Sequence, residues 1–343
     1  EIMPSLVGSE MCIRDRGETE NKGFEASVNW IAIDKKNFGL SFGANISFNK
    51  NKIKSLGSLK TMSNDLTQSY WASSEIGQDY WIEVGGSVGK MYGYVSDGRY
   101  EVSDFERYDE VTETWILRDG VSSSSAVGTA RPGMMKLKDL DNSGDANGSD
   151  DKRVIGDANP LHTGGFNINA RLYGFDLTAN FNWSYGNDIY NANKIEYTST
   201  SKYLYRNLTS DMAGGKRWNN VDAAGNLVTN MAQLAEMNQN TTMWSPYTDK
   251  YIFSDWAVED GSFLRLNTLT LGYTMPTTLV KKVGINNLRF YVTAYNVFCL
   301  TSYSGYDPEV STSRRNGSNL TPGVDYSAYP KSRQFVVGLN LNF

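Results

Sequence analysis

The chain has 343 residues, of which 21% are charged and 13% aromatic, with a formal net charge of −5 and two cysteines. The net negative charge gives no reason to expect nucleic-acid binding, and two cysteines cannot build a disulfide framework. The mean hydropathy is −0.46, and no run approaches the ~20 apolar residues of a transmembrane helix. Alternating barrel strands also average out as polar, so the composition remains compatible with a membrane β-barrel.

Residues 1–20 differ from the rest and are expected to form a non-native or disordered tail. Residues 1–16 do not alternate, and SLVGSEMCIRDR at 5–16 resembles the translated sequencing-adaptor sequence that contaminates some assembled genes. Glu10 and Arg14 interrupt any hydrophobic region, so this stretch is not a signal peptide. The alternative is a genuine flexible N-terminus. On the first interpretation, residues 21–343 are the C-terminal part of a longer protein.

Seven segments alternate apolar and polar residues with a period of two, which is typical of strands with one apolar face. In the last segment, Phe335, Val337 and Leu339 share one register, and the opposite register is mostly polar. The phase slips near Asn267–Thr268, which predicts a β-bulge there. The expected strands are residues 24–32, 38–48, 166–172, 175–185, 263–275, 288–294 and 333–343.

Short and long connections between these strands alternate strictly along the chain. The short ones are 34–37, 173–174 and 276–287, and the long ones are 51–163, 186–261 and 299–332. Bacterial outer-membrane barrels have short periplasmic turns and long extracellular loops, and single-chain barrels have even strand numbers. The pattern therefore predicts an all-β, antiparallel transmembrane β-barrel in the Gram-negative outer membrane, of which about seven strands are present. A soluble β-sandwich is the alternative.

The acidic stretch 139–150 has the spacing of a calcium loop, with oxygen-bearing residues at positions 1, 3, 5, 7, 9 and 12 and Gly144 at position 6. Two features depart from the strong pattern. Ala146 replaces the usual apolar β-branched residue, and an aspartate replaces the bidentate glutamate at position 12. An acidic turn without a metal is the open alternative. The candidate Ca²⁺ ligands are Asp139, Asp141, Ser143, Asp145 through its carbonyl, Asn147 and Asp150.

The residues give little support to catalysis. His162 is the only histidine, so a Ser-His-Asp triad and a His-based zinc site both lack parts. Carboxylates are abundant in the long connections, but nothing picks out a glycosidase-type pair. We therefore expect a protein that is not an enzyme and that has no cofactor apart from the candidate calcium ion.

Aromatic residues in the first two long connections are the candidate substrate contacts, because sugar rings stack on aromatic faces. The same side chains also build loop cores and membrane-interface belts, which is the competing interpretation for each of them. The candidates are Trp71, Tyr80, Trp81, Tyr92, Tyr94, Trp218, Trp244 and Trp256.

A string of motifs over residues 21–343 resembles the SusC/RagA family of TonB-linked outer-membrane transporters. The motifs, in chain order, are NKGFE at 21–25, VGKMYGYVSDG at 88–98, DLDNSGD at 139–145, VIGDANP at 154–160, SYGNDIY at 184–190, FLRL at 263–266, LTLGYT at 269–274 and YSGYDPE at 303–309. The resemblance implies a 22-stranded barrel with an N-terminal plug, neither the plug nor most strands being present here.

The resemblance also implies partners and a function. The partners would be a SusD-type lipoprotein, the TonB complex acting through the missing N-terminal part, outer-membrane lipid, and an oligosaccharide or peptide substrate. The expected function is TonB-dependent nutrient import. The alternative is a soluble secreted β-rich adhesin or a calcium-stabilised carbohydrate-recognition protein, which would need no detergent in solution.

Overall fold

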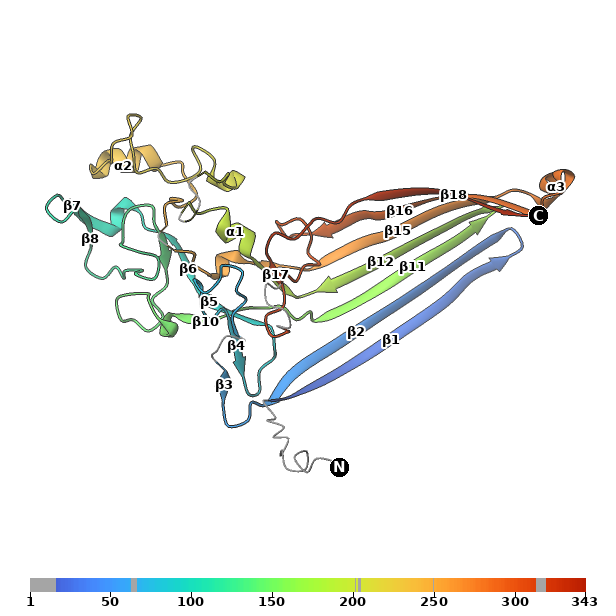
Figure 1. Ribbon diagram of the computed structural model, residues 1–343, viewed down its shortest axis with the longest axis horizontal. Helices are drawn as coiled ribbons and strands as arrows, with labels where there is room; N and C mark the ends of the chain where they lie inside the picture. Colours follow the sequence, from blue (N-terminus) through green and yellow to red (C-terminus); the bar gives the residue numbers. More distant parts are fainter. Residues whose placement is uncertain (1–16, 63–66, 201, 203–204, 249, 313–318) are drawn as a thin grey trace, which may run out of the picture.

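A long antiparallel sheet dominates the fold, and most of the other elements gather at one of its ends (Figure 1). The computed structural model describes residues 17–62, 67–200, 202, 205–248, 250–312 and 319–343. The expectation for residues 1–16 lies outside the described residues.

The sheet contains the seven expected strands in chain order, each paired with the next. It is a meander whose edges are β1 and β18. The short connections and the C-terminus lie at one end and the long segments at the other (Figure 1), as the loop pattern predicted. The strands are β1 (Glu18–Lys35), β2 (Phe38–Ser55), β11 (His162–Leu172), β12 (Phe175–Tyr185), β15 (Phe263–Thr274), β16 (Asn287–Thr301) and β18 (Gln334–Asn342).

The first hairpin extends further than the alternation indicated. We placed residues 18–20 in the tail, but β1 begins at Glu18, and Glu20 pairs with Lys52 of β2. The carboxylate of Glu20 lies 2.6 Å from Lys22 Nζ and 2.7 Å from Lys54 Nζ. The Glu20–Lys54 pair joins β1 to β2 where apolar alternation has ended, and a hydrophobic pattern does not detect such pairing.

The register places most apolar side chains of the seven strands on one face of the sheet. This face is exposed: Phe24 is 65% and Val337 78% accessible. One row of cross-strand partners on it is Trp30, Phe42, Ile168, Ala179, Leu269, Ala294 and Phe335. The neighbouring row, on the opposite face, is Asn29, Gly43, Asn167, Asn180, Thr268, Tyr295 and Gln334.

The predicted bulge lies at Asn267. The pairing of β15 shifts between Leu266 and Thr268 against both β12 and β16. The opposite stretch of β16 contains Asn296 with a positive φ of 52°. The extra residue returns Leu264 and Leu266 to the apolar face and directs Arg265 to the polar face.

Two arginines on the polar face reach across a whole strand. Arg289 of β16 passes over Gly272 of β15 to Asp176 of β12, where its Nε and Nη2 donate to the two carboxylate oxygens at 2.9 and 2.6 Å. Arg171 of β11 passes over Gly39 to reach Asp34 of β1 at 3.0 Å. The absence of a side chain at each glycine makes room for the guanidinium.

We expect Gly272→Ala to destabilise the complete protein by roughly 1–3 kcal/mol, because the added methyl overpacks the ion pair. A Cβ at Gly272 would lie 2.4 Å from Arg289 Nη2 and 2.6 Å from Asp176 Oδ1. Gly214→Ala is the matched control, since a Cβ there meets nothing within 4 Å. Thermal unfolding in detergent measures the effect, and equal midpoints for the two variants would contradict it.

The long segments contain structure of their own rather than extended loops. Their strands are β3 (Thr61–Met62), β4 (Tyr80–Glu83), β5 (Lys90–Tyr94), β6 (Ser96–Arg99), β7 (Phe105–Asp109), β8 (Thr114–Leu117), β9 (Met135–Leu137), β10 (Lys152–Asp157), β13 (Asp188–Asn191), β14 (Val258–Asp260) and β17 (Val324–Asp325). They form a sheet of order β10-β5-β4-β3, a sheet of order β14-β13-β17 and the pairs β6-β9 and β7-β8.

Helices are short throughout the described residues. The α-helices are α1 (Ala192–Glu196), α2 (Met231–Asn238) and α3 (Thr277–Val280), the last of which lies in a short connection. The 3-10 turns are η3 (Val102–Asp104), η4 (Ser149–Asp151), η5 (Ser210–Met212), η6 (Asp255–Ala257) and η7 (Lys281–Val283). None of the helices in this described part is long and apolar enough to cross a membrane.

Candidate functional site

The three long segments pack against one another around shared hydrophobic cores. In the largest, Tyr190 stacks on Phe253 with ring centroids 3.7 Å apart, and Trp71 Nε1 donates to the hydroxyl of Tyr190 at 2.5 Å. Val324 of the third segment joins the same core. Trp71 and Tyr190 lie 119 positions apart in the sequence, and the core contains residues of all three long segments, so the long segments fold as one unit.

Most of the aromatic candidates for substrate contact lie inside these cores. Trp71 is 2%, Tyr80 0% and Trp218 2% exposed, and the ring of Trp244 is buried against Trp256. The structure thus supports the competing interpretation for these side chains: the burial of large rings holds the segments together. A ring enclosed in this way does not present a face to a ligand.

The remaining candidates also pack within the long segments, and Tyr94 belongs to a second core. Tyr92 and Tyr94 are buried, and their hydroxyls donate to the carbonyls of Ser149 and Asn147 at 2.8 and 3.3 Å. Trp81 is half-buried and packs on Tyr92 at 4.8 Å between centroids. Trp256 is covered by the Lys194 ammonium, 4.4 Å from its ring centroid. The two tyrosines therefore fasten the Asp-rich loop to the sheet beneath it.

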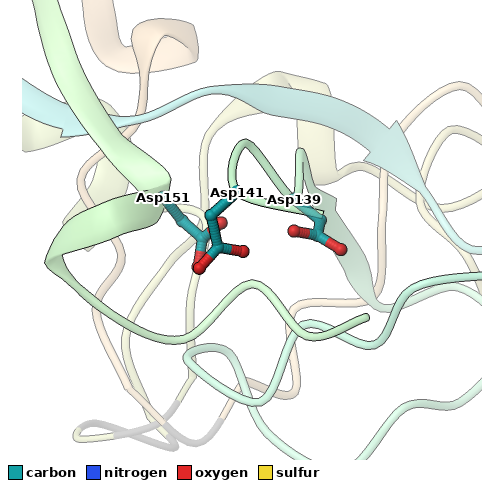
Figure 2. Close-up of side chains that lie close together, drawn as sticks. All are labelled: Asp139, Asp141 and Asp151. Atoms are coloured by element: carbon teal, nitrogen blue, oxygen red, sulfur yellow. The ribbon is translucent and has the colours of Figure 1, made fainter. Parts of the chain in front are cut away.

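The Asp-rich loop brings three carboxylates together. Ligand oxygens of Asp139, Asp141 and Asp151 all lie within 4.8 Å of one another (Figure 2). Asp139 accepts hydrogen bonds from the backbone of Ser143 at 3.1 Å and Gly144 at 2.7 Å, and Asp141 accepts from Ser143 at 2.9 Å. Carboxylate oxygens are the ligands that calcium prefers, so this group can hold a hard cation.

The other predicted ligands lie around this group in different roles. The side chains of Ser123, Ser125 and Asn147 all donate to the carboxylate of Asp145, while its carbonyl accepts from the hydroxyl of Ser143 at 3.2 Å. Asp150 is exposed and stands outside the gathered group. Its neighbour Asp151 is buried instead, and accepts from the backbone of Leu140 and Asn147, each at 2.9 Å.

Hydrogen bonding keeps the loop carboxylates ionised. Desolvation acts to raise the pKa of Asp145, but the bonds from Ser123, Ser125 and Asn147 outweigh it and lower the pKa to about 2. For Asp139, desolvation is likewise outweighed by donors led by the Gly144 N–H, and the pKa falls below its usual value. These two carboxylates are therefore charged at neutral pH.

Comparison with known proteins shows which proteins this chain resembles. No family model matches the chain. It is 31% identical over 343 residues to TonB-dependent receptor P3 of Formosa agariphila, covering 99% of this chain and 30% of that receptor. It is 25% identical over 337 residues to TonB-dependent receptor SusC of Bacteroides thetaiotaomicron, covering 95% of this chain and 27% of that receptor. Among solved structures, the RagAB peptide transporter matches with a TM-score of 0.64 and 21% identity, over 95% of this chain and 29% of that one.

The chain is homologous to SusC/RagA-type TonB-dependent receptors. The structural match establishes the fold: the seven-stranded sheet corresponds to part of a RagA-like β-barrel. The chain spans less than a third of the length of the curated receptors that it matches. These homologues are receptors and transporters rather than enzymes.

Calcium binding by the Asp-rich loop stays a prediction. We expect Asp141→Ala to weaken calcium binding to the complete protein tenfold or more, about 1.4 kcal/mol. Asp222→Ala should change nothing, since Asp222 caps another exposed turn through Ala224 and Asn226. Titration calorimetry with calcium chloride makes the measurement.

A parallel Asp150→Asn variant tests the ligand at the end of the loop. If Asp151 completes the site in place of Asp150, this substitution leaves calcium affinity intact. Unchanged binding in Asp141→Ala, or an equal loss in Asp222→Ala, would identify the loop as a metal-free acidic turn.

The spacing argument missed Asp151 for an identifiable reason. Position 12 of the calcium-loop pattern falls on Asp150, and only the 3-10 turn η4 rotates the next residue inward. The sequence does contain a signal, because Asp150 and Asp151 are adjacent and either carboxylate can supply an oxygen ligand to calcium.

Proposed function

We propose that the chain is part of an outer-membrane importer that takes up a nutrient with energy supplied through TonB. The observation that carries the proposal is the exposed apolar face, formed by all seven strands, in a sheet with its long segments at one end only. Lipid solvates such a face, whereas water does not. The TonB-dependent receptors that the chain matches support the same function.

The proposal includes a SusD-type lipoprotein partner and an oligosaccharide or peptide as the nutrient. Its support is the motif string at 88–98, 139–145 and 303–309, together with the homology to SusC and to a protein described as a peptide transporter. The chain would contribute wall and extracellular segments, and its role would be selective passage rather than catalysis.

Deletion of the gene for the complete receptor tests this function. We expect growth to be lost when one class of oligosaccharide or peptide is the sole source, and unchanged on simple sugars or amino acids. Re-expression should restore growth only in cells that have TonB. Normal growth of the deletion strain on every oligosaccharide and peptide would contradict nutrient import.

Detergent dependence separates the importer from the adhesin. The complete importer should sediment with membranes and require detergent to stay in solution, because its apolar face must be covered. A protein that stays monodisperse in buffer without detergent would support the secreted adhesin instead.

A further inference from the structure

A cavity of about 750 Å³ lies where three distant segments of the chain meet. One wall comes from the start of α1 and from Thr209–Asp211, the second from Ser304–Tyr306 after β16, and the third from Ser327–Pro330 after β17. Ligand sites in proteins span roughly 300–1,000 Å³. The cavity therefore has the size to hold several units of an oligomeric ligand.

Two asparagines hold the three walls in place. Asn193 Nδ2 donates to the carbonyl of Asp325 at 3.2 Å, and its Oδ1 accepts from the backbone of Ser327 at 2.8 Å. Asn191 Nδ2 donates to the hydroxyl of Ser304 at 3.4 Å. The walls are thus fixed to one another before any ligand arrives, which lowers the entropic cost of binding.

Two tyrosines on these walls behave unlike the other aromatics of the long segments. Tyr306 is 81% and Tyr329 91% exposed, whereas Trp71, Tyr80 and Trp218 are buried. No hydrogen bond within the described residues involves the hydroxyl of Tyr306 or of Tyr329. Both rings therefore offer an apolar face and an unused polar tip to a ligand.

Apart from Lys194, the polar side chains that line the cavity are neutral or acidic. Thr209 Oγ1 is buried and lacks a hydrogen-bond partner among the described residues. Asp211 is exposed and forms no ion pair in that part of the chain. The one lysine, Lys194, is already engaged by the Trp256 carbonyl at 2.8 Å and by Glu259 at 3.3 Å. Among the described residues that line the cavity, a ligand thus meets hydroxyl and carboxylate oxygens but no free cation.

We propose that this cavity binds a neutral oligosaccharide, stacked on Tyr306 and Tyr329 and hydrogen-bonded through its hydroxyls to Asp211. Sulfated or uronic-acid sugars would place their charge beside Asp211 with no cation to balance it. A peptide carboxylate would have the same difficulty. The inference rests on the proposed import function only for delivery of the sugar, because binding can be measured on its own.

The test measures binding of neutral hexasaccharides to the complete receptor in detergent. The probes are maltohexaose, cellohexaose, laminarihexaose, mannohexaose and xylohexaose, with a hexagalacturonate and a hexapeptide library as the competing classes. Binding of a neutral probe is expected, with a loss of roughly tenfold or more in Tyr306→Ala/Tyr329→Ala and in Asp211→Asn. Tyr247→Ala, which removes another exposed tyrosine outside the cavity, should bind like the parent protein.

Three results would overturn the proposal. They are no binding of any neutral probe, binding that the Tyr306→Ala/Tyr329→Ala variant leaves unchanged, and preferential binding of the hexagalacturonate or the peptides. Failure of the import function is a separate result, since it would appear as unimpaired growth of the deletion strain while the purified receptor still binds sugar.

Discussion

Val337→Arg is expected to impair assembly of the complete receptor in the outer membrane, whereas Val336→Arg, one residue earlier, is tolerated. Val337 is 78% exposed on the apolar face and pairs with Val292. Val336 points to the opposite face and pairs with Thr293. An arginine on the lipid face costs roughly 2–4 kcal/mol near the midplane, while the same side chain in a hydrated lumen keeps its water.

The pair of variants isolates the effect of the face on which the arginine lies, because both replace the same residue type in the same strand. The measurement is the fraction of receptor that is extracted from outer membranes in the folded, heat-modifiable form. Equal assembly of both variants would contradict the lipid-facing role of the apolar face, and a defect in Val336→Arg alone would reverse the assignment of the two faces.

Arg265→Met is expected to release the third long segment from the wall of the sheet. Arg265 is 2% exposed, and its Nη2 donates to Asp307 Oδ1 at 2.6 Å, while its Nε lies 2.9 Å from Glu309 Oε2. Its Nη1 donates to Asn296 Oδ1 at 2.5 Å. Removing one partner of a buried ion pair costs roughly 3–5 kcal/mol, because the carboxylate that remains is desolvated without compensation.

Limited proteolysis of the intact protein measures this release, since cleavage within residues 302–312 or 319–333 reports local opening. We expect Arg265→Met to be cut much faster than the parent protein. Adding Asp307→Asn should restore much of the protection by removing the buried charge. Replacing Lys331, a half-exposed partner of Glu309 at 2.6 Å, by Met is the control and should have little effect. Identical cleavage rates for all variants would show that the ion pair does not hold the segment.

The sheet was predictable because a two-residue period is a local property of a strand. The bulge at Asn267 was predictable for the same reason, as the phase of Leu264 and Leu266 disagrees with that of Leu269 and Leu271. The start of β1 at Glu18 was missed because ion pairs rather than apolar alternation support it.

The interior of the long segments was not predictable, since its contacts join distant positions. Nothing near Arg265 in the sequence indicates that Asp307 is its partner, and nothing near Trp71 indicates that Tyr190 encloses it. At the acidic loop, spacing located the cluster to within one residue, and Asp151 lies where Asp150 was expected. Composition identifies aromatic side chains, but only packing separates a core residue such as Tyr80 from an exposed one such as Tyr306.

The arginines that cross Gly39 and Gly272 have a mechanical consequence. Each ties a strand to its next-but-one neighbour, so Arg289 couples β16 to β12 even though β15 separates them. Withdrawing β16 under tension therefore breaks an ion pair to a strand outside its own backbone ladder. Close to the short connections, β12, β15 and β16 should therefore resist a pulling force together. They should separate from the sheet as a group rather than one strand at a time.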